Sequence, residues 1–299
     1  MTTRGLIAEC VPVGGHIGGE AGESMTTLQA KRVHMIAGGF PPGTPAGHDH
    51  DYARMRLLEL LGQHEHTHTT VAGDFTDIEK WLPGTQFLVT YVAGPFADDE
   101  GTAFLRKWLE AGGRWLALHG SSGGKAVLDK TTGRRRMVKM PYHDALGGFF
   151  IAHPPVRKFR VDVVDREHPL TRGLPAFFDT IDEPYMVELQ QPPHCHVLMT
   201  SQLGPHPSPE SGFQFDRDTA LMADGKTRVL GYVRDMGQGA VAYFTLGHCH
   251  TPTTNSQRSV DVSVDPNGIT PLTLRTSWET EAFRTLLRNA MAWGLARGA

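Results

Sequence analysis

The strongest constraint on the fold of this chain is a repeated alternation of short apolar runs with helical segments. Apolar runs occur at Arg32–Ile36, Phe87–Val92 and Arg114–Leu118, while Tyr52–Leu61 and a segment from about residue 98 to residue 111 carry apolar residues at helical spacing. Strands that alternate with helices form parallel sheets, because each helix crosses the sheet before the next strand begins. The pattern therefore predicts an α/β fold, with a mostly parallel sheet and helices on both of its faces.

One of these runs ends at a histidine that is followed by a glycine and two hydroxyl side chains. In Gly112–Gly124, with the sequence GGRWLALHGSSGG, a buried strand would deliver His119, Gly120 and Ser121 to the carboxyl edge of the sheet. Ligands of open α/β sheets bind at that edge. We therefore take His119 as a candidate catalytic residue, and Gly120 and Ser121 as candidate substrate-binding residues. A structural histidine beside a glycine loop is the alternative.

Four further segments place ionisable side chains beside glycine or proline. Candidate residues are His48 and Asp49 in PPGTPAGHDHD, His153 in FFIAHPP, Asp182, Glu183 and Tyr185 in DTIDEPYMVEL, and His248 and His250 in LGHCH. An aspartate before a helix can also serve only as its cap. The spacing of His248 and His250 suits a metal site, but no Cys/His quartet accompanies the pair.

The remaining segments complete an outline of one domain. Strands are expected at His64–Val71, Arg157–Val164 and His196–Thr200, and a hairpin is expected from Val229–Asp235 and Ala240–Thr245 around a glycine turn. Lys125–Lys139 is interpreted as a basic polar insertion. Thr276 and Glu279 predict a capping box for the last helix. Residues 1–30 are interpreted as a loose leader, with Met25 as an alternative start, and residues 31–299 as a single domain.

Charge and cysteine content narrow the class of partner. The 299 residues hold 29 basic and 32 acidic side chains, so neither a nucleic acid nor an anionic membrane surface is the expected partner. Three separated cysteines, Cys10, Cys195 and Cys249, form no disulfide framework, and no apolar run is long enough to cross a bilayer. We expect a cytoplasmic protein with a small-molecule ligand, and a homodimer as the default assembly.

Taken in order, the motifs resemble the ThuA-like family, named for trehalose utilisation, from about Arg32 to Trp293. The resemblance rests on the glycine loop before His48, on GGRWLALHGS, LGGFFIAHP, EHPLTRGLP and FDTIDEPY, and on VLGYVRDMGQGAVAYFTLGH. It implies a flavodoxin-like three-layer sandwich of the class I glutamine-amidotransferase-like superfamily. It also implies a role in the metabolism of sugars or keto-sugars. Two features depart from the family pattern. The chain has Arg114-Trp115 where the family has a small residue, and it has a long polar loop between His250 and Thr276.

The resemblance also bears on the chemistry. Amidotransferases of this fold carry a nucleophilic cysteine at the sharp turn after a strand, and here His119 stands at about that place. We therefore expect no functional glutamine amidotransferase.

Three hypotheses follow from these residues. The first is an enzyme that acts on a sugar or keto-sugar, as an isomerase or hydrolase, with His119 and either Glu183 or Asp182 transferring protons. In this hypothesis His48, Asp49, His153, Tyr185 and His248 line the pocket. The second is a divalent-metal enzyme whose ligands come from His48, Asp49, His119, Glu183, His248 and His250. The third is a sugar-binding or regulatory module without turnover.

Overall fold

The computed structural model describes residues 30–296 apart from residues 40, 42 and 211. Met25, Cys10 and all but the last residue of the expected leader therefore lie outside the described residues. Within the described part, the main sheet has nine strands in the order β2-β1-β3-β4-β13-β12-β11-β8-β9. Their bounds are β1 Lys31–Gly38, β2 Thr67–Ala72, β3 Phe87–Val92, β4 Arg114–Leu118, β8 Arg157–Val163, β9 Phe177–Asp182, β11 Cys195–Ser201, β12 Arg228–Met236 and β13 Gly239–Phe244.

The first half of the sheet is parallel, as the alternation of strands and helices predicts. β2, β1, β3, β4 and β13 all pair in parallel. β3, β13 and all but the first residue of β4 are buried, which explains why their sequences are nearly continuous apolar runs. The carboxyl ends of these strands consequently lie at one edge of the sheet.

The second half of the sheet is antiparallel. β12 and β13 form the expected hairpin, and β11, β8 and β9 continue it with alternating directions. β12 and β8 therefore run against the other strands, and β9 again ends at the same edge as β13. The sequence pattern does not predict β9 as a strand, because its residues alternate irregularly between exposed and buried positions.

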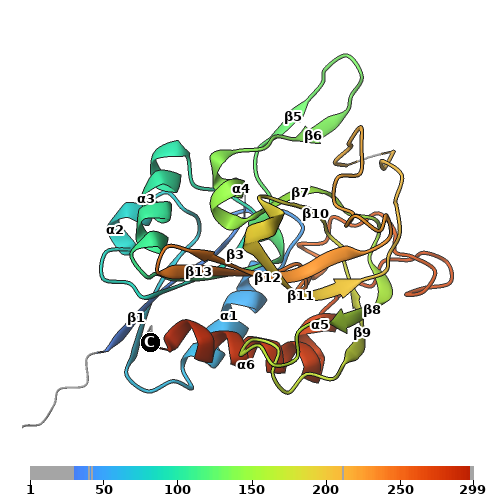
Figure 1. Ribbon diagram of the computed structural model, residues 1–299. Helices are drawn as coiled ribbons and strands as arrows, with labels where there is room; N and C mark the ends of the chain where they lie inside the picture. Colours follow the sequence, from blue (N-terminus) through green and yellow to red (C-terminus); the bar gives the residue numbers. More distant parts are fainter. Residues whose placement is uncertain (1–29, 40, 42, 211, 297–299) are drawn as a thin grey trace, which may run out of the picture.

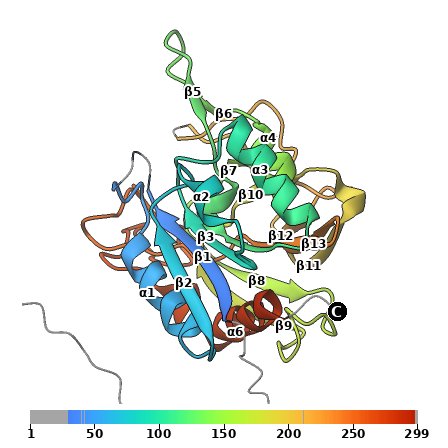
Figure 2. The same ribbon diagram turned by 90° about the vertical axis from the view of Figure 1, so that its left-hand side faces the viewer.

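Two helix layers cover the sheet, as the sequence predicts. Figures 1 and 2 show α1 and α6 on one face and α2, α3 and α4 on the other. Each layer has its own hydrophobic core, with Leu57 and Leu286 on the first face and Leu105 and Trp115 on the second. The helices are α1 His50–Leu61, α2 Ile78–Trp81, α3 Asp99–Glu110, α4 Pro141–Leu146, α5 Thr276–Glu279 and α6 Glu281–Leu295, with short 3-10 helices η1 His119–Ser122 and η2 Pro192–His194.

The structure differs from the outline drawn from the sequence at three places. The insertion Lys125–Lys139 contains a hairpin of β5 Ala126–Leu128 and β6 Arg135–Met137, which projects from the body of the protein in Figure 1. A second small sheet pairs β7 Gly148–Ala152 with β10 Met186–Leu189, from stretches in which the sequence predicts no strand. The strand expected from His64 begins only at Thr67, because His66 adopts a left-handed backbone with φ 59°.

The expected capping box of the last helix is also wrong. Thr276 opens the separate short helix α5, and Thr280 takes an extended backbone with ψ 143° that ends α5. The hydroxyl of Thr280 then accepts from the backbone N–H of Phe283 and caps α6. Among the described helices, none combines the length and apolar character needed to cross a membrane.

Candidate metal centre

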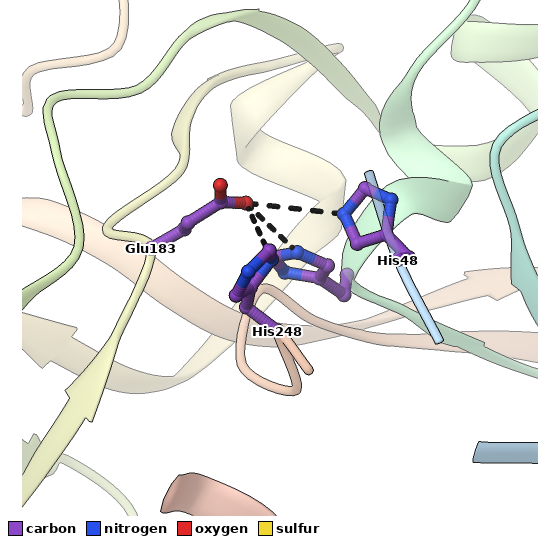
Figure 3. Close-up of side chains that lie close together, drawn as sticks. His48, Glu183 and His248 are labelled. Atoms are coloured by element: carbon purple, nitrogen blue, oxygen red, sulfur yellow. Dashed lines mark hydrogen bonds and ion pairs between the residues drawn. The ribbon is translucent and has the colours of Figure 1, made fainter. Parts of the chain in front are cut away.

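Four side chains meet at the carboxyl edge of the parallel strands. His48 lies in the loop between β1 and α1, His119 follows β4, Glu183 follows β9, and His248 follows β13. One ligand atom from each lies within 4.8 Å of the others, and the last three residues are buried. Figure 3 shows the carboxylate of Glu183 with one oxygen directed at the imidazoles of His48 and His248.

His119 is held in place by a strained turn. It has a left-handed backbone with φ 44°, at the point where β4 passes into η1. Its carbonyl accepts from the hydroxyl of Tyr243 at 2.9 Å. Its Nδ1 lies 2.7 Å from the carbonyl of Thr245, and its Nε2 lies 3.2 Å from Oε2 of Glu183. Since a carbonyl only accepts, Nδ1 donates to Thr245, and in a neutral ring this would leave Nε2, the nitrogen that faces Glu183, without a proton.

In His248, the neighbouring His250 decides which ring nitrogen carries the proton. His250 Nε2 lies 2.8 Å from the carbonyl of Pro271, so this nitrogen donates and His250 Nδ1 accepts. His248 Nε2 lies 2.9 Å from that Nδ1 and must donate to it. The Nδ1 of neutral His248 is therefore unprotonated, and it lies 3.1 Å from Oε2 of Glu183.

In His48, too, the ring nitrogen that faces a backbone carbonyl carries the proton. Its Nδ1 lies 3.1 Å from the carbonyl of Ala46 and donates to it. Its unprotonated Nε2 lies 3.9 Å from Oε2 of Glu183 and 3.4 Å from the hydroxyl of Tyr185. All three histidines thus have one nitrogen tied to an outer partner and the other directed at one carboxylate oxygen.

This arrangement is the one that a cation requires. Three nitrogen lone pairs and a carboxylate oxygen repel one another unless a proton or a metal ion lies between them. With metal–nitrogen and metal–oxygen bonds of about 2.0–2.2 Å, neighbouring ligand atoms of a tetrahedral site are about 3.3 Å apart. The distances from Oε2 of 3.1, 3.2 and 3.9 Å bracket that value. Outer hydrogen bonds that fix the tautomer of each histidine are typical of metal ligands.

The pKa shifts agree with such a site. Burial alone would raise the pKa of Glu183, but the neighbouring histidines, above all His153 and His248, hold it well below its usual range. Burial, together with the charges of His119 and His248, lowers the pKa of His48 well below 6.5. Burial opposes protonation of His248 as well, yet Glu183 raises the pKa of its imidazole. A metal ion bound there would have to displace any proton that His248 carries on Nδ1.

Asp182, the other candidate carboxylate, has a different role. Its Oδ1 accepts from the backbone N–H groups of Glu183 and His248 at 2.8 and 3.0 Å, and its Oδ2 accepts from Gly247 N–H and from the hydroxyl of Ser277. Its oxygens are thus occupied by internal donors. Asp182 anchors the loop after β13 to the end of β9, and it does not point at the four-residue cluster.

The other candidate residues divide into two groups. Tyr185 and His153 lie beside the cluster: the ring of Tyr185 stacks on His119 at 4.0 Å, and His153 Nε2 lies 3.7 Å from Oε1 of Glu183. The remaining candidates contact other parts of the protein. Asp49 caps α1 and pairs with Arg275 at 2.6 Å, and Ser121 bonds to Thr90.

The last two candidates also lie outside the four-residue group. Gly120 packs against β3, where a Cβ atom would lie 2.7 Å from the carbonyl of Val92. His250 contacts Nε2 of His248, which is the ring nitrogen that does not face Glu183.

Gln257 is a site residue that sequence reasoning missed. Its side-chain amide donates to Oε1 of Glu183 from the polar loop between β13 and α5. No local pattern marks this residue, because it lies in an aperiodic segment and reaches the site only through the fold of that loop.

Cysteine chemistry finds no support in the described residues. Burial raises the pKa of Cys249 to about 12 and that of Cys195 to about 11, so both thiols stay protonated at neutral pH. Neither one follows β4, where His119 stands.

The central sheet and the two helix layers that cover it define an α/β protein with a flavodoxin-like three-layer fold (Figure 1). The family model for ThuA, described as trehalose utilisation, matches residues 43–262. The chain belongs to the ThuA family.

Solved structures agree with this membership at the level of the fold. A ThuA-like protein from Bacteroides uniformis is 17% identical with a TM-score of 0.59, over 93% of this chain and 97% of that chain. A ThuA-like protein from Parabacteroides merdae is 14% identical with a TM-score of 0.53, over 89% and 90%. The chain has no significant match among curated protein sequences.

Proposed function

We propose that this protein is a metal-dependent enzyme that acts on a sugar or keto-sugar. In this proposal His48, His119, His248 and Glu183 hold a divalent transition-metal ion, for which imidazole-rich sites are suited. The observation that carries it is the convergence of three imidazole nitrogens, one each from His48, His119 and His248, on one oxygen of Glu183. The carbohydrate substrate class is supported by the family, whose description is trehalose utilisation.

The chemistry of the proposal follows from the charge of the ion. A bound cation polarises a carbonyl or hydroxyl oxygen of the substrate, which favours either hydrolysis or isomerisation. His153, with its side chain 23% exposed, lies at the cluster on the side of Oε1 and is placed to contact a bound sugar. Tyr185 presents its hydroxyl to His48 and gives the same side an aromatic wall.

A second candidate function uses the same residues without a metal. His119 Nε2 lies 3.2 Å from Oε2 of Glu183, so a proton between the two could be passed to a substrate carbon. Chelation separates the two candidates. A metal enzyme loses turnover of its sugar in chelator and regains it when the ion is returned, whereas direct proton transfer between His119 and Glu183 is unaffected.

The first experiment measures metal content. Protein purified without chelator should carry about one transition-metal ion per chain, and Glu183→Gln and His248→Gln should each lose it. His34→Gln is a matched control, because His34 is a buried histidine on β1 that bonds Thr70 instead of the cluster. Wild-type protein without stoichiometric metal, and without a thermal shift on addition of zinc, manganese, nickel or cobalt, would overturn the proposal.

The substrate class is tested on the metal-loaded protein. Sugars and keto-sugars are screened by thermal shift, because a specific ligand stabilises the folded state by mass action. Product formation from any sugar that binds then distinguishes an enzyme from a sugar-binding module without turnover. Binding with no product under any metal would favour the module.

A further inference from the structure

The two oxygens of Glu183 face opposite kinds of partner. Oε2 faces one ring nitrogen each of His48, His119 and His248. Oε1 accepts a hydrogen bond from the amide of Gln257 and lies 3.7 Å from Nε2 of His153. A carboxylate only accepts, so the nitrogen of the Gln257 amide must be the atom that faces it.

Gln257 belongs to an ordered segment, residues 251–275, that is pinned to the body at several points. The backbone of His250 pairs with that of Leu274, so the two ends of the segment are held together. Asp261 N–H donates to the carbonyl of Val156 at 2.9 Å, and Val260 and Leu274 share a small hydrophobic cluster with Val156. These contacts hold the segment that carries Gln257 against the body of the protein.

The same segment also supports His248. The carbonyl of Pro271, near its far end, accepts from His250 at 2.8 Å, and His250 in turn accepts from His248. Glu183 and His248, which follow different strands, therefore each have an outer hydrogen bond that depends on segment 251–275. Outer partners of this kind change metal affinity by about 10- to 100-fold when they are removed.

Resting on the proposed metal site, we propose that Gln257 is a positioning residue that makes Glu183 a one-oxygen ligand. By occupying Oε1 it leaves only Oε2 for the cation. With Glu183 supplying one oxygen, the three imidazoles and Oε2 would make four ligands, and the ion could expand to a fifth that comes from an oxygen of the substrate. Segment 251–275 thereby sets how tightly the ion is held.

The test compares Gln257→Met, which keeps the side-chain length but removes the donor, with Val262→Ala. Val262 lies in the same segment and is 73% exposed. Metal affinity is measured by competition with a chelator of known affinity, using zinc. Gln257→Met should bind zinc about 10-fold more weakly than wild type, and Val262→Ala should match wild type. Both metal-free variants should unfold at the wild-type temperature.

Cobalt provides a readout that a merely structural role would not change. In Gln257→Met the freed Oε1 can turn toward the ion, so the visible absorption of the cobalt-loaded protein should differ from that of wild type. An unchanged zinc affinity together with an unchanged cobalt spectrum would overturn the role of Gln257 while leaving the metal site in place. Failure of the wild-type protein itself to bind zinc or cobalt would overturn both.

Discussion

Replacing Gly120 with alanine tests whether close packing of the backbone positions His119. A Cβ atom at residue 120 would lie 2.7 Å from the carbonyl oxygen of Val92 and 3.4 Å from its carbon. Both contacts are to the backbone of β3, which is buried, so no flexible side chain can move aside. Forcing extra volume into a packed core costs about 1–3 kcal/mol. In a chain of this size, 1 kcal/mol corresponds to about 2 °C in melting temperature, so a fall of about 2–6 °C is expected.

The measurement is thermal unfolding of the metal-free protein, followed by zinc titration. Gly73→Ala is the matched control: a Cβ atom at Gly73 would meet no heavy atom within 4 Å, and the backbone there is not left-handed, so this variant should melt within about 1 °C of wild type. Because Gly120 adjoins His119, Gly120→Ala should also bind zinc more weakly. A variant that melts and binds like wild type would refute the packing argument.

Three further predictions concern other parts of the fold. Tyr243→Phe removes the hydroxyl that bonds both to the carbonyl of His119 and to Ser122, and leaves these two groups only their own longer contact of 3.5 Å. The free energy of unfolding should fall by about 1–3 kcal/mol in denaturant titration, and no loss would show that the tyrosine hydroxyl does not stabilise the turn. Burial lowers the pKa of His34 from 6.5 to about 4, so the unfolded chain binds the extra proton in this window. Stability due to His34 is therefore present above pH 6.5 and is lost as the pH falls toward 4, with a slope of up to about 1.4 kcal/mol per pH unit that His34→Phe should remove. Cys249→Ser should keep its metal and its turnover, because a thiol with a pKa of about 12 supplies no nucleophile; loss of turnover with intact metal would contradict this.

The parallel half of the sheet could be predicted because its signal is local. β3 and β4 have the bounds expected from their apolar runs, and α3 begins beside its capping aspartate, Asp98. The antiparallel half was harder to predict because a partly exposed strand such as β9 has a mixed pattern, and the same holds for β10 in the small second sheet. Periodicity also did not distinguish a projecting hairpin from a polar loop at β5 and β6.

The candidate site was predictable in its members but not in its arrangement. His48, His119, Glu183 and His248 all stand out in the sequence because they follow strands or precede a helix beside glycine or proline. Which nitrogen of each ring is free depends on carbonyl groups far away in the chain, such as that of Thr245 for His119. Several polar residues lie next to one another in the sequence, and the direction of the backbone at a single position decides which of them faces the cluster.

The pair Asp182 and Glu183 shows how that choice is made. Across four strand spacings a flat sheet would hold β9 about 19 Å from β13, yet Asp182 accepts hydrogen bonds from Gly247 and His248 just after β13. The loop after β13, together with the twist of the sheet, must therefore close that distance. Successive side chains at a strand end point in opposite directions, so only one carboxylate of the pair can enter the cluster. Because Asp182 is fixed on the backbone of the loop that carries His248, Glu183 is turned toward the three imidazoles. A slip of one residue in β9 would exchange the two roles and leave no carboxylate held in place for the ion.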